Sequence, residues 1–166
     1  QFTNAFVERR NLLPVGVLRL ALPATAGLPP LSQWPADLRE KIGESIFMVR
    51  GGYQYDGRIN SELDEVAIAE AAHVMAERGI TAVAIVGLFS PVNSDMELRA
   101  ASIVQSIIPE ARITMSHRIG RPGILERENA AVMNASLADL STLVVRSFRA
   151  ALLSLKISAP FYITQN

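Results

Sequence analysis

The stretch TAVAIVGLF, residues 81–89, decides the fold. It is almost entirely apolar and does not alternate between apolar and polar residues, which is typical of a strand buried on both faces of a parallel sheet. Helical patterns precede and follow it, and strands that alternate with helices form parallel sheets with right-handed crossovers. The sequence therefore predicts an α/β fold with a mainly parallel sheet flanked by helices, in which residues 82–89 are a central strand.

Both neighbouring helices carry signals at their starts. The first helix is predicted over Glu62–Arg78, because Ser61 can cap it and Asp64 follows three residues later. The second helix is predicted to start at a capping box, because Ser94 and Glu97 have the S-x-x-E spacing in which each side chain bonds to a backbone N–H of the other residue. An apolar stripe of helical period follows the box and supports this assignment.

The chain divides into two parts with different sequence patterns. Residues 1–60 hold most of the prolines and glycines and are predicted to be loop-rich, whereas residues 61–166 alternate helix and strand. A length of 166 residues suits one domain, so residues 1–166 are interpreted as a single α/β domain. Further strands are expected at Val15–Leu20, Ile46–Val49, Arg112–Met115 and Phe161–Thr164, a short helix at Pro35–Ile42, and a helical region at Leu125–Lys156 that could break near 134–136 or near Ser141.

The composition limits the possible partners. Sixteen basic residues balance sixteen acidic ones, and no segment concentrates Lys and Arg, so nucleic acid is not an expected partner. The chain has no cysteine, which excludes disulfides, thiolate zinc sites and cysteine nucleophiles. The longest apolar run is far shorter than the ~20 residues that span a bilayer, and no export signal opens the sequence. We therefore expect a cytoplasmic protein with no membrane partner.

Phosphate-binding loops are not recognisable in this sequence. Gly52 and Gly57 have the four-residue gap of a P-loop, but Arg58 and Ile59 follow where Lys and then Ser or Thr are needed, and no helix is predicted to start there. No G-x-G-x-x-G occurs either. Gly51 and Gly52 are therefore interpreted as a turn after a strand, in which glycine permits positive φ.

The two histidines differ in their surroundings. His73 lies between alanines in a predicted helix and is interpreted as a surface or half-buried residue. His117 follows Ser116 at the end of a predicted strand, at the edge where ligands of open α/β sheets bind. It could bond to the loop backbone or belong to a site, but adjacent strand residues point to opposite faces, so Ser116 and His117 are not expected to form a catalytic dyad. No spacing signature indicates a metal site, and none is expected.

Two asparagine-containing segments are candidates for ligand contact. Asn93 lies between the central strand and the next helix, where it could contact a ligand or stabilise the turn. In the polar cluster of residues 126–129, Arg127 shares a helix face with Asn134. The acidic residues of this cluster suit a helix N-terminus, yet Asn129 and Asn134 are poor helix formers in an otherwise apolar helix. Functional and structural interpretations of the cluster remain open.

These segments together resemble the hydantoinase/oxoprolinase family, which includes 5-oxoprolinase and hydantoin utilization protein A. The resemblance runs over nearly the whole chain, and although single motifs are weak, their occurrence in this order is fairly specific. The motifs are Thr3-Asn4-Ala5 with Glu8-Arg9-Arg10, Gly51-Gly52-Tyr53 with Asp56-Gly57-Arg58, Leu63-Asp64-Glu65, Phe89-Ser90-Pro91-Val92-Asn93 with Glu97, Ser116-His117 with Ile119-Gly120, Leu125-Glu126-Arg127-Glu128-Asn129-Ala130-Ala131 with Asn134-Ala135, and Thr164-Gln165-Asn166.

The resemblance implies part of an actin-like, ribonuclease H-like ATPase lobe in a hydrolase that uses ATP to open a cyclic amide such as hydantoin or 5-oxoproline. It implies ATP and Mg in the full-length parent, with the remaining lobes of the same polypeptide and a second hydantoinase subunit as partners. Related members carboxylate ketones, so the reaction class stays open. In this scheme the substrate-binding residues would be Asn93, Ser116, Arg127 and Asn129, while the catalytic and cofactor-binding residues stay unknown.

The sequence departs from the family pattern at both ends. Family members open with an Asp and a Gly-Gly-Thr phosphate loop well before the Thr-Asn-Ala segment and continue into an Asp-Gly-Thr stretch, and this sequence has neither. The chain is therefore interpreted as an excised piece of the N-terminal portion, inactive alone and with no cofactor bound. A non-catalytic structural or interaction module is the alternative from a different class.

Overall fold

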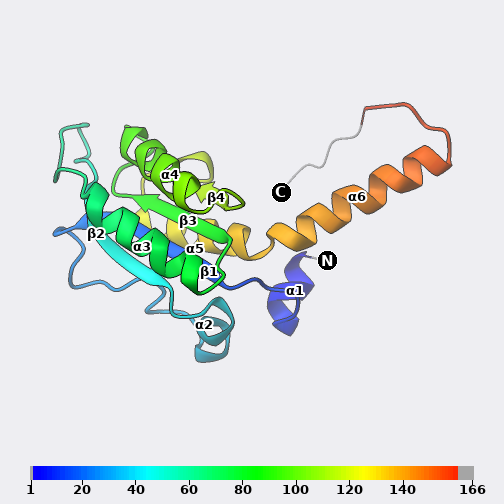
Figure 1. Ribbon diagram of the computed structural model, residues 1–166, viewed down its shortest axis with the longest axis horizontal. Coiled ribbons are helices and arrows are strands. Elements are labelled where there is room, and N and C mark those ends of the chain that lie inside the picture. Colours follow the sequence, from blue (N-terminus) through cyan, green and yellow to red (C-terminus); the bar gives the residue numbers. More distant parts are fainter. Residues whose placement is uncertain (1, 161–166) are drawn as a thin grey trace.

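The computed structural model describes residues 2–160, and its centre is a parallel sheet (Figure 1). The sheet has four strands in the order β2-β1-β3-β4, and all neighbouring pairs are parallel. Strand β3 is an inner strand and is buried along its whole length, as the apolar run at residues 81–89 predicted. The strands are β1 (Val15–Leu22), β2 (Ile46–Arg50), β3 (Ala82–Gly87) and β4 (Arg112–Met115). The strand expected at Phe161–Thr164 lies outside the described residues.

The helices occupy nearly all of the positions that the sequence predicted. They are α1 (Phe2–Glu8), α2 (Ala36–Ile42), α3 (Glu65–Glu77), α4 (Asp95–Ile107), α5 (Ile124–Ser136) and α6 (Ala138–Ser154), with a 3-10 turn η1 (Ser116–Arg118) after β4. The helical region that begins near residue 125 breaks at Leu137, next to the first of the two predicted places. Helix α1 was not predicted, and the boundaries of the other helices lie within a few residues of the expected ones.

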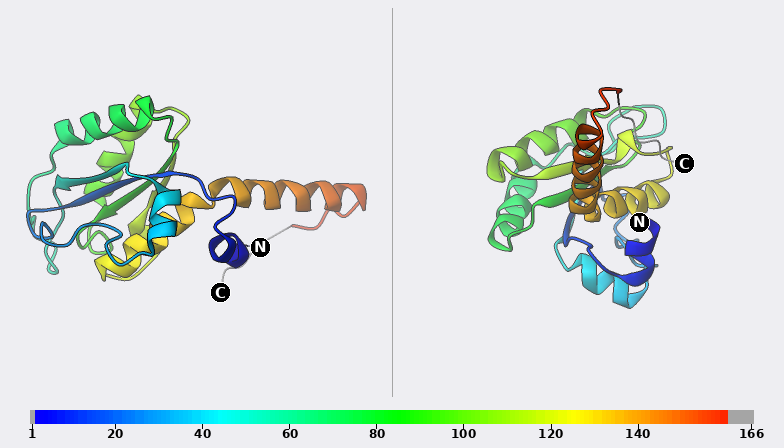
Figure 2. Two further views of the ribbon diagram at one scale, coloured as in Figure 1. Left: turned by 90° about the horizontal axis from the view of Figure 1, so that it is seen from below. Right: turned by 90° about the vertical axis from the view of Figure 1, so that its right-hand side faces the viewer.

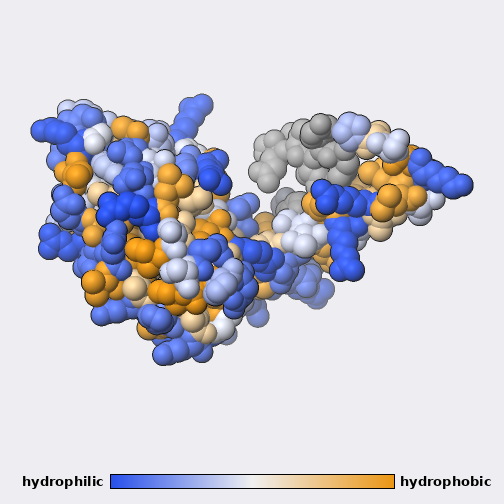
Figure 3. Space-filling view, turned by 45° about the horizontal axis from the view of Figure 1, so that its top comes forward, coloured by the Kyte–Doolittle hydropathy of each residue, from blue (hydrophilic) through white to orange (hydrophobic). Residues whose placement is uncertain are grey.

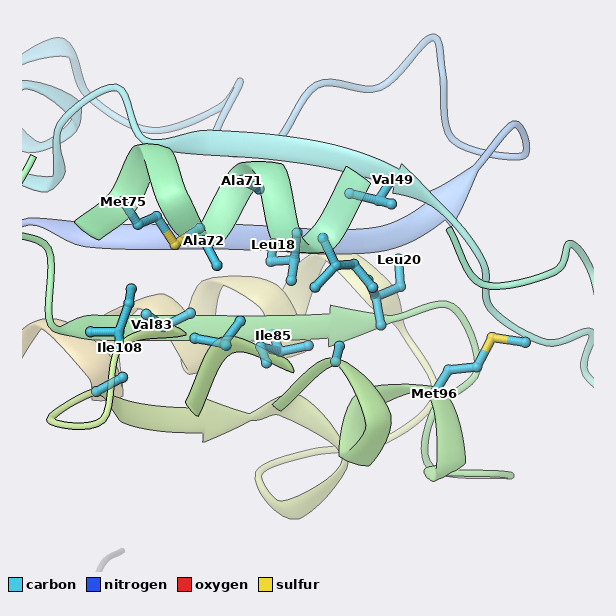
Figure 4. Packing of buried hydrophobic residues seen from close by; sticks show 14 of the residues in the cluster. Leu18, Leu20, Val49, Ala71, Ala72, Met75, Val83, Ile85, Met96 and Ile108 are labelled. Atoms are coloured by element: carbon cyan, nitrogen blue, oxygen red, sulfur yellow. The ribbon is translucent and has the colours of Figure 1, made fainter. Parts of the chain in front are cut away.

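The two faces of the sheet carry different helices. On one face, Leu18 of β1 and Ile85 of β3 pack with Ala72 and Met75 of α3 and with residues of α4 (Figure 4). The alternate strand residues point to the other face, where Val86 and its neighbours pack against α5. This alternation follows from the period-two geometry of a strand, and it explains why the inner strands contain almost no polar side chains.

Both predicted helix caps differ from the observed ones. Helix α3 is capped by Asp64, whose carboxylate accepts a hydrogen bond from the backbone N of Ala67 at 3.0 Å, and Ser61 lies outside the helix. At the start of α4, Ser94 makes no capping bond, and the predicted capping box does not form. Its second member, Glu97, is buried, and its carboxylate bonds to groups at the ends of β3 and β4. Tertiary partners therefore replace the local backbone partner that the spacing suggested.

Helix α6 extends away from the sheet as a long arm (Figures 1 and 2). None of its residues is buried, and both apolar and charged side chains lie on its surface (Figure 3). Residues 2–160 contain no helix with the length and apolar character needed to cross a bilayer.

Candidate functional site

The carboxyl ends of the strands form the edge at which open parallel sheets bind ligands, most often where the strand order reverses. In this sheet the reversal lies between β1 and β3. The chain itself fills that place, because Leu88 N donates to Leu20 O at 3.0 Å and Tyr53 N donates to Leu88 O at 2.9 Å. Gly52 lies in this turn at φ +88°, and a Cβ on it would be 2.6 Å from that of Leu88. Polar side chains gather instead beside it, at the ends of β3 and β4.

Glu97 is the centre of this polar cluster. It projects from the first turn of α4 and is 0% exposed. Its Oε1 accepts hydrogen bonds from Gly87 N at 2.7 Å and Ser116 Oγ at 2.5 Å. Its Oε2 accepts from His117 N at 3.1 Å and lies 2.6 Å from His117 Nδ1. An ionised carboxylate has about four acceptor positions, so these partners satisfy all of them.

Ser116 connects the carboxylate to a buried arginine. Its single hydroxyl hydrogen is donated to Glu97, so its oxygen is free to accept from Arg127 Nε at 2.8 Å. Ser90 Oγ lies 3.3 Å from Ser116 Oγ and is therefore the donor in that pair. The hydroxyl is thus held from three directions, and its position fixes the distance between the buried anion and the buried cation.

Arg127 uses all three guanidinium nitrogens within the protein. Besides Ser116, it donates to the backbone oxygens of Arg121 at 3.0 Å and Pro122 at 2.8 Å, and to that of Gly87. The side chain is 1% exposed, and this burial lowers the pKa of its guanidinium from the ordinary value. Because every nitrogen is engaged, Arg127 acts as a clamp that joins the turn before α5 to the ends of β3 and β4.

His117 is the member of the cluster that reaches solvent. It lies in the 3-10 turn η1, and its side chain is 16% exposed, whereas that of Glu97 is fully buried. An anionic carboxylate accepts rather than donates, so the hydrogen between the two side chains belongs to Nδ1 of the imidazole. In the neutral imidazole this leaves Nε2 with a lone pair, a pattern found in general bases and in metal-ligating histidines.

The structure joins two of the four predicted substrate-binding residues and places the other two elsewhere. Ser116 and Arg127 form the cluster described above. Asn93 is exposed, and its Oδ1 accepts from Asp95 N at 3.0 Å, which is the turn-stabilising role considered for it. Asn129 is half-buried, and its Oδ1 accepts from the indole Nε1 of Trp34 at 2.7 Å.

The sequence did not predict Glu97 as a site residue, and it left the role of His117 open. The dyad excluded between Ser116 and His117 does not form, but both side chains contact Glu97 because η1 turns them toward the same carboxylate. A signal for Glu97 was present, since it precedes Ala100 by three residues and Val104 by seven and so lies on the buried stripe of α4. An acidic residue on an apolar stripe needs buried partners.

The buried ion pair between Arg19 and Glu128 was not predicted from the sequence either. Arg19 Nε and Nη2 of β1 each donate at 2.7 Å to the two carboxylate oxygens of Glu128 on α5. Both side chains are essentially inaccessible to solvent. The pair therefore fixes α5 against β1. It also gives a structural role to Glu128, one of the polar residues at 126–129.

The described residues form no metal site at the polar cluster, and the hollow between α1 and α6 lies elsewhere. Within residues 2–160, no group of three or more His, Asp and Glu side chains is arranged to hold a metal ion. A hollow of about 440 Å³ lies between α1 and α6, and residues such as Ala5, Leu143 and Val144 line it. None of the cluster residues lines this hollow.

The comparisons with known proteins agree with this architecture. A family model described as the hydantoinase/oxoprolinase N-terminal region matches residues 1–108. The ATP-dependent caprolactamase from Pseudomonas jessenii superposes on 97% of the chain with a TM-score of 0.72 and 23% sequence identity. The nucleotide-free structure of acetone carboxylase superposes on 90% with a TM-score of 0.70 and 14% identity. At such identities the likeness shows the fold alone. The chain spans 24% of the length of each solved chain, and no curated protein sequence matches it significantly.

Proposed function

The chain belongs to the hydantoinase/oxoprolinase family, as its motifs predicted, and on that premise we propose that it is one part of an ATP-dependent enzyme that opens the ring of a cyclic amide such as hydantoin or 5-oxoproline. In this proposal, the 166 residues supply the strand-end cluster around Glu97 and His117. The nucleotide chemistry belongs to the rest of the polypeptide.

Hydrolysis of a cyclic amide requires activation of its carbonyl group. Amides are poor electrophiles. Transfer of a phosphoryl group to the carbonyl oxygen turns that oxygen into part of a better leaving group, phosphate, before water attacks. Each ~1.4 kcal/mol removed from the barrier raises the rate about tenfold, so an activated intermediate can account for a large part of the acceleration. ATP with Mg would supply this activation in the parent enzyme.

The observation that carries the proposal is the buried carboxylate of Glu97 holding the imidazole of His117 2.6 Å away at the ligand edge of the sheet. A titratable group that is open to solvent at this edge can contact a ligand. The cluster has only one such group, which suits contact with a small uncharged ring whose remaining surface is enclosed by other parts of the polypeptide.

Carboxylation of a ketone is the second candidate function. The similarity to acetone carboxylase favours it, and the cluster around Glu97 contains nothing specific to an amide nitrogen. Both reactions require a carbonyl oxygen to become a nucleophile toward a phosphoryl donor, so one strand-end site can serve either of them.

The experiment uses the full-length polypeptide together with any subunit that co-purifies with it. ADP release is measured with ATP and Mg in the presence of hydantoin, 5-oxoproline or caprolactam, and separately with acetone and bicarbonate, while mass spectrometry follows the products. We expect a cyclic amide to raise ADP release and to yield its ring-opened acid. Stimulation by the ketone alone would assign the protein to the carboxylases, and no stimulation by any of these compounds would favour an interaction module.

A further inference from the structure

We propose that His117 is a catalytic residue of this site, whose Nε2 accepts the proton that the substrate loses when its carbonyl oxygen is phosphorylated. The inference rests on the proposed function and adds a chemical role within it. It also applies to both candidate reactions, because a cyclic amide loses an N–H proton and a ketone loses a C–H proton next to the carbonyl group.

The contacts of Glu97 determine the tautomer of His117. Glu97 Oε2 receives the backbone N–H of His117 at 3.1 Å and faces Nδ1 at 2.6 Å. The other oxygen of the same carboxylate receives Gly87 N and Ser116 Oγ, so donors surround the carboxylate on all sides. Only the Nδ1–H tautomer completes this set without placing two acceptors against each other. In the neutral imidazole, Nε2 is therefore the nitrogen with the lone pair.

Nε2 of His117 is accessible to a ligand. None of the residues at 2–160 forms a hydrogen bond with Nε2 of His117, and no side-chain nitrogen or oxygen of these residues is both buried and without a partner. Nε2 must therefore retain contact with solvent, in agreement with the 16% exposure of the side chain. A substrate that replaces this solvent meets the lone pair directly.

Charged side chains of α4, η1 and the loop before α5 surround the imidazole of His117. Glu97 on α4 is in direct contact, and Arg127 on α5 is connected only through Ser116. Arg118 in η1 and Arg121 in the loop before α5 are exposed, and no carboxylate among the described residues pairs with either of them. The carboxylate stabilises the imidazolium that forms when Nε2 takes up a proton, while the exposed arginines attract an anionic phosphoryl donor.

Proton transfer to Nε2 accompanies phosphorylation of the carbonyl oxygen. The N–H bond of the amide breaks, its proton passes to Nε2, and the electron pair forms a C=N bond while the π pair of the carbonyl moves to oxygen. That oxygen attacks the terminal phosphorus of a nucleoside triphosphate, and the bond to the nucleoside diphosphate breaks with its electron pair on the leaving oxygen. For a ketone the same description holds, with a C–H bond in place of N–H and an enol phosphate as the product.

Nitrogen NMR of the 166-residue chain tests the tautomer without any substrate. The sequence contains only two histidines, so exposed His73 on α3 provides an internal control. At about pH 8.5, where an ordinary imidazole is neutral, we expect Nδ1 of His117 to give the protonated-nitrogen signal and Nε2 the lone-pair signal. His73 should show the opposite pattern, which is the preference of a histidine in water. The proposal is wrong if His117, like His73, carries its hydrogen on Nε2 and has its lone pair on Nδ1.

Turnover of the full-length polypeptide tests the role itself. His117→Asn places an amide nitrogen near the position of Nδ1, so the bond to Glu97 is retained while the proton acceptor is lost. We expect turnover to fall about 10²–10⁴-fold with little change in Tm, and partial rescue by added imidazole. His73→Asn is the matched control and should retain wild-type turnover.

The failures of the two proposals are distinguishable. If the wild type releases ADP with none of the amides or ketones, the proposed function is wrong and the role of His117 falls with it. If the wild type turns over and His117→Asn does so within a few-fold, only the role of His117 is overturned. Loss of turnover with a large fall in Tm and no rescue by imidazole would make His117 a structural residue.

Discussion

Arg127 is a buried cation whose bonds go mainly to backbone oxygens. Its three nitrogens donate to a serine hydroxyl and to backbone carbonyls, and it forms no direct ion pair with Glu97 within the described structure. Burial lowers the pKa of its guanidinium, while the charges of Glu97 and Glu128 act in the opposite direction. Of the two interpretations open from the sequence, a ligand clamp and a structural clamp, the geometry favours the structural one.

Substitution of Arg127 by Lys should destabilise the protein. A lysine ammonium cannot span the hydroxyl of Ser116 and the backbone oxygens together, so buried acceptors lose their donors at a cost of about 2–4 kcal/mol. Thermal unfolding measures the loss, and Arg118→Lys, at an exposed position, is the control that should change stability by less than ~0.5 kcal/mol. A loss of turnover in the full-length enzyme with an unchanged Tm would instead identify Arg127 as a ligand clamp.

Tyr53 should make the protein less stable at alkaline pH. Its side chain is 5% exposed, and burial, together with the nearby carboxylate of Asp95, raises the pKa of its hydroxyl. Above about pH 10 the unfolded chain ionises its tyrosines while folded Tyr53 keeps its proton, so the free energy of unfolding must fall as the pH rises. Urea unfolding between pH 8 and about pH 11 should show a smaller fall for Tyr53→Phe than for the wild type.

The control for this prediction is Tyr55→Phe, because Tyr55 is 75% exposed. This variant should retain the alkaline slope of the wild type. Equal slopes for the wild type and both variants would show that Tyr53 does not contribute to the loss of stability at high pH.

At the scale of elements, the pair of Arg19 and Glu128 joins strand β1 to helix α5. Removing one member leaves an uncompensated buried charge, so Arg19→Met or Glu128→Leu alone should cost about 3–5 kcal/mol. The double variant restores a neutral interior and should be more stable than either single variant. Denaturant unfolding of the four proteins in a double-mutant cycle measures the coupling. A double variant that loses the sum of the two single losses would contradict this account.

Gly52 is the glycine on which the close approach of the β2–α3 connection to the sheet depends. Its φ is +88°, and an added Cβ would lie 2.6 Å from Leu88 Cβ and 2.8 Å from the backbone oxygen of Leu20. Gly52→Ala should therefore cost about 2–5 kcal/mol, from backbone strain and overpacking together.

Gly79→Ala separates the two contributions. Gly79 has a similar φ of +68°, but no atom lies within 4 Å of the position of its Cβ, so its substitution should cost only about 1–2 kcal/mol of backbone strain. Thermal unfolding of both variants gives the comparison. Equal losses would mean that the contact with Leu88 relaxes without cost.

The contrast between β3 and Glu97 shows which features the sequence could predict. The run at residues 81–89 carries its signal locally, because both faces of an inner strand are buried and every residue reports this. Glu97 carries two local signals that disagree, its capping-box spacing and its place on the buried stripe of α4, and the partners that decide between them include Ser116, 19 residues away. Glu128 depends on Arg19, which is 109 residues distant. Local patterns therefore predicted the elements but not the long-range pairs that form the polar sites.

At the scale of the whole molecule, our proposal makes the strand-end cluster one part of a larger enzyme. We expect the 166-residue chain alone to bind ATP weakly and not to hydrolyse it, because no glycine-rich loop in its sequence opens a helix at the spacing that phosphates require. Calorimetric titration with ATP and Mg should give no measurable heat of binding in the micromolar range. A micromolar Kd would show that a nucleotide site lies within these residues.

The position of a bound substrate is the most direct test of the central claim that the cluster of Glu97, Ser116, His117 and Arg127 belongs to an active site. The measurement is a crystal structure of the full-length polypeptide with a cyclic amide and a non-hydrolysable ATP analogue. The account predicts the amide nitrogen within about 3.2 Å of His117 Nε2, the distance of a hydrogen bond that can pass a proton. An amide bound elsewhere, with Nε2 of His117 facing only solvent or protein, would contradict it.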